Sequence, residues 1–211
     1  MASNFEMLEG PPVLDPKGLR ALLAAPDKRT RLGKRDAALI AILGLGGLRA
    51  GECASIKVCD LQNGDQGVLR IRLKTLKRRN HWRVVSLPLV GSRAVRRWFH
   101  VRKPKQGPWL FPGAKGNALT TRAIEKLLAR YFDSIGRPDL HLHSLRHSAL
   151  SLLMRATGDL YRVQRMAGHA SPTTTAQAYL SWSTREADEN AAAMAVAISG
   201  SRQGGDSRKR D

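Results

Sequence analysis

Apolar residues recur with helical spacing along most of this chain. Helices are predicted over residues 14–25, 35–46, 92–101 and 120–135, with a short one from residue 50. Asp15 suits the N-cap of the first helix, because Pro16 then takes the first helical position, where proline is favoured. The segment 35–46 is apolar nearly all round, which predicts a buried central helix that ends at Gly46 and Gly47.

Two further patterns complete the predicted architecture. Residues 68–87 alternate in a way that predicts two strands joined by a basic turn. Helices are then predicted over residues 144–156, 159–167, 172–182 and 185–199. The fold class is therefore α+β, mainly α-helical with one small antiparallel β-hairpin. We expect a flexible leader over residues 1–14, a single domain over 15–199 and a disordered basic tail over 200–211.

The charge of the chain points to a polyanionic partner. Its 36 Lys and Arg residues against 17 Asp and Glu residues give a net charge of +19. Such a surface attracts DNA or RNA. The longest apolar run, residues 37–48, is too short to cross a bilayer, and no signal peptide pattern is present. Cys53 and Cys59 are expected to be reduced thiols, so we predict a cytoplasmic protein that makes no membrane contact.

Residues 141–147 place three histidines and an arginine at the mouth of a predicted helix. Ser144 suits its N-cap, which puts Arg146 and His147 in the first turn. Cations there oppose the helix dipole, so a bound phosphate would explain them, since helix N-termini favour anions. His143 and His147 have the spacing of a zinc pair, but no Cys, Asp or Glu stands nearby. An anion site, a metal site and a simple capped helix all remain open from these residues alone.

Two more stretches carry candidate chemistry. Arg49 follows a Gly-Gly turn, where rigid backbone would hold it, although one arginine by itself is typical of a charged surface. Gly168 suits the end of a helix and is followed by His169. Ser171 and Pro172 then suit the start of a helix that carries Tyr179, which by itself is typical of a core tyrosine.

Taken in order, these stretches resemble the tyrosine recombinase family, which includes the phage integrases. The matching motifs are G-L-R-A-G-E at residues 47–52, Lys74-Thr75 in the hairpin, H-S-L-R-H at residues 143–147, and Gly168-His169 followed by three threonines and Tyr179. The resemblance covers about residues 15–185 and implies the catalytic-domain fold of that family. Two features depart from the family pattern. Residues 169 and 179 are separated by one residue more than usual, and we expect no separate N-terminal core-binding domain.

The resemblance implies six catalytic residues: Arg49, Lys74, His143, Arg146, His169 and Tyr179. Tyr179 would attack a DNA phosphate, with His143 as the base and Lys74 as the acid that protonates the 5′-hydroxyl leaving group. Both arginines and His169 would stabilise the charge on the phosphate oxygens. No carboxylate cluster is present to hold magnesium, so we expect neither a metal nor another cofactor.

Other residues are given supporting roles. Glu52, three residues after Arg49, would orient that arginine. Six basic residues are expected to grip the DNA backbone: Lys77, Arg78, Arg79, Arg122, Lys126 and Arg130.

The resemblance implies a site-specific recombinase that cleaves and rejoins strands through a 3′-phosphotyrosine, without ATP. Its partners would be double-stranded DNA with specific recombination sites and three further copies of the chain, as a homotetramer on two duplexes. Without DNA, the chain would be a monomer or a weak oligomer. Residues 187–199 would pass to a neighbouring copy or pack on their own core. The alternatives are a type IB topoisomerase or a telomere resolvase that uses the same site, or a catalytically silent DNA-binding protein.

Overall fold

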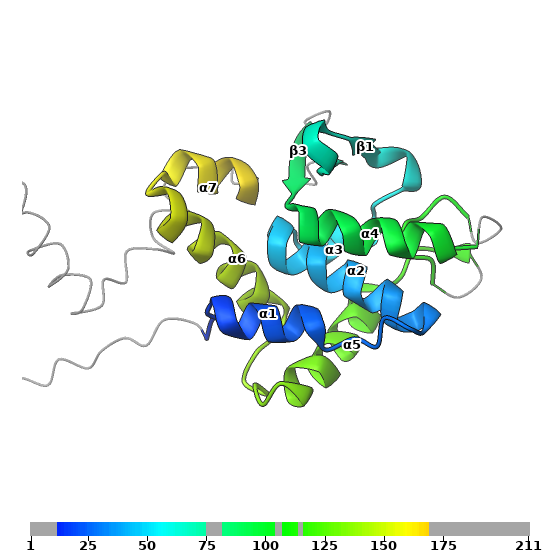
Figure 1. Cartoon of the computed structure of the whole chain (residues 1–211), viewed down its shortest axis with the longest axis horizontal. Helices are drawn as coiled ribbons and strands as arrows, with labels where there is room; N and C mark the ends of the chain where they lie inside the picture. Colours follow the sequence, from blue (N-terminus) through cyan, green and yellow to red (C-terminus); the bar gives the residue numbers. More distant parts are fainter. Residues whose placement is uncertain (1–11, 75–81, 104–106, 114–115, 169–211) are drawn as a thin grey trace, which may run out of the picture.

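The computed structural model describes residues 12–74, 82–103, 107–113 and 116–168 (Figure 1). Its elements run in this order: α1 (Pro16–Ala24), α2 (Arg31–Gly46), α3 (Ala50–Ala54), η1 (Val58–Asp60), β1 (Leu61–Asn63), η2 (Asp65–Gly67), β2 (Leu69–Lys74), β3 (Trp82–Leu87), α4 (Leu89–Val101), α5 (Thr121–Ser134), α6 (Leu142–Thr157) and α7 (Leu160–Ala167). The predicted fold class, mainly helical with a small antiparallel sheet, is confirmed. The helices predicted at 172–182 and 185–199, and the tail, lie outside the described residues.

Helix α2 is the centre of the structure, as its apolar sequence predicts. It contacts α1, α3, α4, α6 and β3, and Figure 1 shows α4 running alongside it. It begins four residues earlier than predicted, because the Thr30 side chain accepts a hydrogen bond from the Gly33 N–H and caps the helix. Gly47 ends it in the left-handed conformation, with φ at 61°, and its N–H donates to the Leu43 carbonyl.

The sheet has three antiparallel strands in the order β1-β2-β3. The predicted hairpin is confirmed as β2 and β3, whereas β1 is only three residues long, too short to show a period in the sequence. In the hairpin, Leu73 lies opposite Arg83 and Lys74 lies opposite Trp82. Alternate residues of both strands are buried against the helices, so the register fixes which hairpin side chains face inward.

The start of α6 differs from the prediction that Ser144 is its N-cap. His141 is the cap instead: its Nδ1 accepts from the Ser144 N–H at 3.2 Å, and its own N–H donates to Ser144 Oγ at 3.4 Å. An imidazole nitrogen can replace the usual hydroxyl or carboxylate acceptor, which the sequence pattern did not reveal. The N-cap therefore lies three residues earlier than predicted and the helix begins at Leu142, so that His143 lies in its first turn and Arg146 in the next.

The N-terminal end of the described chain packs on α6. The N–H of Leu14 donates to Ser148 Oγ at 2.7 Å, and Ser148 Oγ donates to the Ser144 carbonyl at 2.7 Å. Leu14, the last residue of the expected leader, is buried in the core. Helix α1 follows with Asp15 as N-cap and Pro16 at its start, as predicted.

Candidate active site

Arg49 stands where α2 ends and α3 begins. Gly47 turns the chain, Leu48 is buried, and Arg49 becomes the N-cap residue of α3. Its side chain is 37% exposed, so its guanidinium is partly open to solvent. Arg49 Nη1 lies 3.4 Å from Glu52 Oε1 and 3.5 Å from the carbonyl oxygen of Ala167. Ala167 is the last residue of α7. The backbone turn thus presents Arg49 beside the end of α7.

Arg146 reaches the same place from α6 but is buried, with a side chain only 5% exposed. Its Nη1 donates to the Gly47 carbonyl and its Nη2 to the Ala167 carbonyl, each at 2.7 Å. One guanidinium therefore joins the C-terminal end of α2 to that of α7. The carbonyls at both helix ends lack partners within their own helices and carry partial negative charge, so they suit a buried cation.

Glu52 connects the arginines. Its side chain is 1% exposed, and its Oε2 accepts the Arg49 backbone N–H at 2.8 Å. Its two oxygens accept from Nη1 and Nη2 of Arg83 at 2.7 and 2.9 Å, and Arg146 Nη1 lies 3.9 Å from Oε2. Burial alone would raise the pKa of this carboxyl, but the hydrogen bonds and charge of Arg83 and Arg49 outweigh burial and hold its pKa below the ordinary value.

Arg83 belongs to this cluster, although the sequence analysis did not single it out. Its side chain is 11% exposed and comes from the inward face of β3. The available signal was parity: Val85 and Leu87 face the core, so Arg83, on the same side of the strand, must also point inward. A charged residue at an inward position of a strand predicts a buried partner of opposite charge.

His143 and His147 lie one turn apart on α6, with ring centroids 5.0 Å apart in an edge-to-face contact. The pKa of His143 is lowered below its ordinary 6.5. The largest cause is partial burial, followed by the charges of Arg146, His141 and Arg49. The pKa of His147 is lowered for similar reasons, with burial again the largest. A neutral imidazole beside two guanidinium groups can accept a proton.

The remaining candidates are placed only in part. Lys74 is exposed at the end of β2, opposite Trp82. His169, Tyr179, Lys77, Arg78 and Arg79 lie outside the described residues. Within the described ranges, no group of three or more His, Cys, Asp or Glu side chains could hold a metal ion. In the same ranges, no helix has the length and apolarity needed to cross a membrane.

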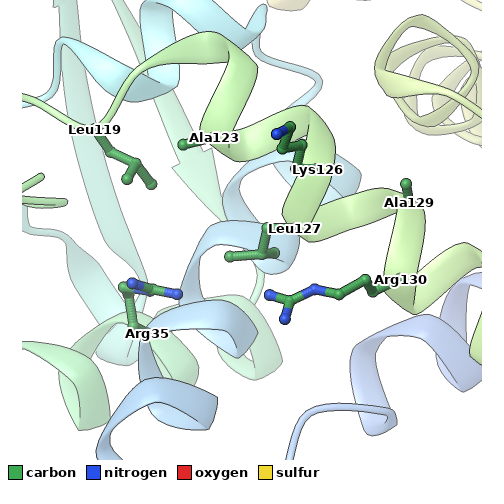
Figure 2. Close-up of a pocket in the computed structure, with 7 residues that line it drawn as sticks. All are labelled: Arg35, Leu119, Ala123, Lys126, Leu127, Ala129 and Arg130. Carbon is green, nitrogen blue, oxygen red and sulfur yellow. The ribbon is translucent and has the colours of Figure 1, made fainter.

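A second basic surface lies on α5. Arg122, Lys126 and Arg130 are all exposed along this helix. Lys126 and Arg130 line a pocket of about 630 Å³ together with Arg35 of α2, and Figure 2 shows the Arg130 guanidinium pointing toward Arg35. Asp36 pairs with Arg35 at 2.8 Å and accepts the Tyr131 hydroxyl at 3.0 Å. Helix α5 therefore exposes three cations at four-residue spacing, while its apolar residues are buried.

Comparison with known proteins shows the family of this chain. The model of the phage integrase family matches residues 12–186, and the chain therefore belongs to the phage integrase family. It is 33% identical over 169 residues to the tyrosine recombinase XerC of Chromohalobacter salexigens, covering 78% of this chain and 54% of that protein. It is 34% identical over 172 residues to XerC of Methylobacterium nodulans, covering 76% of this chain and 51% of that protein. The chain spans about half the length of these relatives.

Solved structures show the same architecture. The recombinase XerH, in a post-cleavage complex with its palindromic difH substrate, superimposes with a TM-score of 0.74 at 28% identity, covering 86% of this chain and 52% of that one. The Tn1549 transposon integrase bound to transposon right end DNA superimposes with a TM-score of 0.69 over 89% of this chain and 67% of that one. At 18% identity this second likeness concerns the fold alone.

The first prediction concerns Glu52. Because Glu52 is buried among arginines, Glu52→Gln is expected to lower the free energy of unfolding at pH 7 by about 3–5 kcal/mol, the usual loss when one member of a buried pair is removed. The folded pKa is depressed, so this stabilisation is complete above the ordinary value of 4.5 and is lost as the pH falls through the folded pKa. Urea unfolding at pH values from 7 down to 3 should therefore show that the difference in free energy of unfolding between the wild type and Glu52→Gln becomes smaller in acid. Glu125→Gln serves as the control, because Glu125 is exposed. A difference in free energy of unfolding that becomes larger in acid would contradict a lowered pKa for Glu52.

The second prediction concerns His143. NMR titration of the folded protein without DNA is expected to give His143 a pKa below 6.5, with the resonance assigned by its loss in His143→Gln. The folded state then binds fewer protons than the unfolded state, so His143 reduces stability as the pH falls below 6.5. The urea-unfolded protein is the reference and should titrate near 6.5. A folded value at or above that of the unfolded chain would rule out a neutral base.

Proposed function

We propose that this chain is the catalytic part of a site-specific DNA recombinase that breaks and rejoins strands through a 3′-phosphotyrosine. The observation that carries the proposal is the pair Arg49 and Arg146, held beside His143 at the ends of α2 and α7. Membership of the phage integrase family supports it, as do relatives that are named tyrosine recombinases. Lys74, His169 and Tyr179 complete the proposed catalytic set, and their roles rest on the family resemblance.

The chemistry follows from the charges at the site. Tyr179 Oη attacks the phosphorus, a new O–P bond forms, and the bond from phosphorus to the 5′-oxygen breaks. His143 takes the tyrosine proton, and Lys74 gives a proton to the leaving 5′-oxygen. Charge grows on the two non-bridging oxygens, where planar guanidinium groups can each bind in a bidentate manner. Because the tyrosyl phosphodiester replaces the DNA phosphodiester, reversal by a 5′-hydroxyl rejoins a strand without another energy source.

We propose double-stranded DNA as the partner, with recombination by four copies on two duplexes. The net charge of +19 and the exposed cations of α5 support DNA binding. Among the similar solved structures, that of XerH contains its difH substrate. Arg122, Lys126 and Arg130 are proposed to contact the DNA backbone, as are Lys77, Arg78 and Arg79, which follow β2 in the sequence. Glu52 is proposed to hold Arg49 in place before DNA arrives.

The third prediction identifies the nucleophile. Nicked suicide duplexes that carry the genomic sequence flanking this gene should give a covalent protein–DNA adduct on denaturing gels, without added metal. Tyr179→Phe should abolish the adduct, because it lacks the attacking oxygen, and should leave DNA affinity unchanged. Tyr161→Phe is the matched control, since Tyr161 is exposed on α7 and is expected to keep full adduct yield.

Each result of this assay leads to a different conclusion. An adduct that persists in Tyr179→Phe would show that another side chain attacks. Tight binding without any adduct in the wild type would favour a DNA-binding protein without catalytic activity. Relaxation of supercoils without exchange between two duplexes would favour a type IB topoisomerase.

The fourth prediction concerns α5. Lys126 is exposed at the middle of the basic row, so Lys126→Ala should weaken DNA binding for specific and unrelated sequences alike. The slope of log Kobs against log salt concentration should decrease in magnitude by about 0.9, the value for one lost phosphate contact. Fluorescence anisotropy over a salt series measures both quantities. Lys17→Ala in α1 is the control, and an equal loss in that variant would show that only overall charge matters.

A further inference from the structure

Arg83 makes the best-oriented ion pair of the candidate site. Its two terminal nitrogens donate to the two oxygens of Glu52 at 2.7 and 2.9 Å. The Arg83 side chain is 11% exposed and the Glu52 side chain 1%. A bidentate pair fixes the orientation of both groups as well as their distance, which a single contact does not do. The pair therefore constrains the two elements that carry it, β3 and α3.

The elements joined by this pair are those that carry the proposed chemistry. The same Glu52 carboxylate accepts the Arg49 backbone N–H at 2.8 Å, so Arg83 and Arg49 are positioned by one acceptor. On the hairpin, Arg83 directly follows Trp82, which lies opposite Lys74 in the register of β2 and β3. The hairpin end that bears Lys74 is thus connected through Arg83 and Glu52 to the arginine turn, the residues 47–49 between α2 and α3.

The end of α7 also lies against Arg83. A Cβ atom built on Gly168 would come 2.5 Å from Arg83 Nη1 and 2.8 Å from its Cζ. Gly168 has φ at 63°, so glycine is favoured there both by its backbone conformation and by the guanidinium beside it. In Figure 1, α7 and β3 both lie in the upper part of the molecule, above α6. Arg83, which belongs to the hairpin, therefore contacts both Glu52 beside the arginine turn and the C-terminal end of α7.

We propose that Arg83 is a positioning residue that sets where Lys74 stands relative to Arg49 and Arg146. This inference rests on the proposed function, in which Lys74 protonates the leaving 5′-oxygen. Proton transfer requires the two heavy atoms to come within about 2.6–3.2 Å. Lys74 is exposed at the end of β2, and its partner in the strand register, Trp82, directly precedes Arg83. The Arg83–Glu52 pair supplies that constraint from the neighbouring strand.

The test separates loss of the acid from loss of phosphate binding. Two suicide duplexes are compared, one with the ordinary 5′-oxygen and one with sulfur in its place. Sulfur leaves as a thiolate, which needs no proton from an acid because the pKa of a thiol is near 8.5. Arg83→Lys and Arg83→Gln are measured beside Lys74→Ala and the wild type, at saturating DNA. The rate of adduct formation and the affinity for DNA are recorded for each.

We expect both Arg83 variants to cleave the oxygen duplex ~10- to 100-fold more slowly than the wild type, the range for a misplaced catalytic group. On the sulfur duplex they should come within about threefold of the wild type, as Lys74→Ala should, because the missing proton no longer matters. DNA affinity should stay within about twofold, since Glu52 already accepts hydrogen bonds from both terminal nitrogens of Arg83. Arg70→Gln is the matched control. Arg70 lies in β2 and pairs with the exposed Asp65 of η2, so its loss should leave both rates unchanged.

Several results would overturn the proposal. An Arg83 defect that sulfur does not relieve, while it relieves Lys74→Ala, would show that Arg83 acts on the phosphate-binding arginines instead. A fall in DNA affinity would show direct contact with DNA. Thermal unfolding identifies variants that fail to fold, and failure of both would make Arg83 a stability residue only. If sulfur does not relieve Lys74→Ala, or the wild type forms no adduct, the proposed function itself has failed, which is a different result from a defect confined to Arg83.

Discussion

A buried carboxylate is the constraint on which this site depends. Glu52 is almost fully removed from water, and an ionised carboxylate in that position is strongly unfavourable unless it is paired and hydrogen-bonded. Arg83 satisfies both of its oxygens, and the backbone N–H of Arg49 adds a third bond. Because these groups stabilise one another in the folded protein, the turn that carries Arg49 is fixed before any phosphate binds. A site arranged in advance does not have to be reorganised during the reaction.

The same centre is left with an excess of positive charge. One carboxylate faces the guanidinium groups of Arg49, Arg83 and Arg146, at 3.4, 2.7 and 3.9 Å. Carbonyl oxygens at the ends of α2 and α7 compensate Arg146 in part, since helix C-termini carry partial negative charge. Arg83 and Arg146 also join the elements that surround them, and Arg49 is the most exposed of the three guanidinium groups. The ends of α2 and α7 and the start of α3 therefore form a positively charged site, which suits an anion.

The start of α6 shows how a local detail changes the chemistry. With His141 as the cap, His143 moves into the first turn of the helix and Arg146 into the next, on the buried side. Partial burial, and after it the charges of Arg146, His141 and Arg49, lower the pKa of His143 and so disfavour its protonated form. The feature that first suggested an anion site, cations at a helix N-terminus, therefore also helps to keep the imidazole able to accept a proton.

The sequence by itself determined the elements and most of the candidate residues. All-round apolarity identified α2, alternation identified the hairpin, and ordered motifs identified Arg49, Lys74, His143 and Arg146, because these signals are local or are written in linear order. Only the tertiary structure decided how they meet. Arg83 and Glu52 are 31 positions apart, and Arg146 bonds carbonyls 99 and 21 positions away, so no local pattern could pair them. The depth of burial of Glu52, and with it the direction of its pKa shift, depends on packing between β3, α3 and α6, which a linear pattern does not contain.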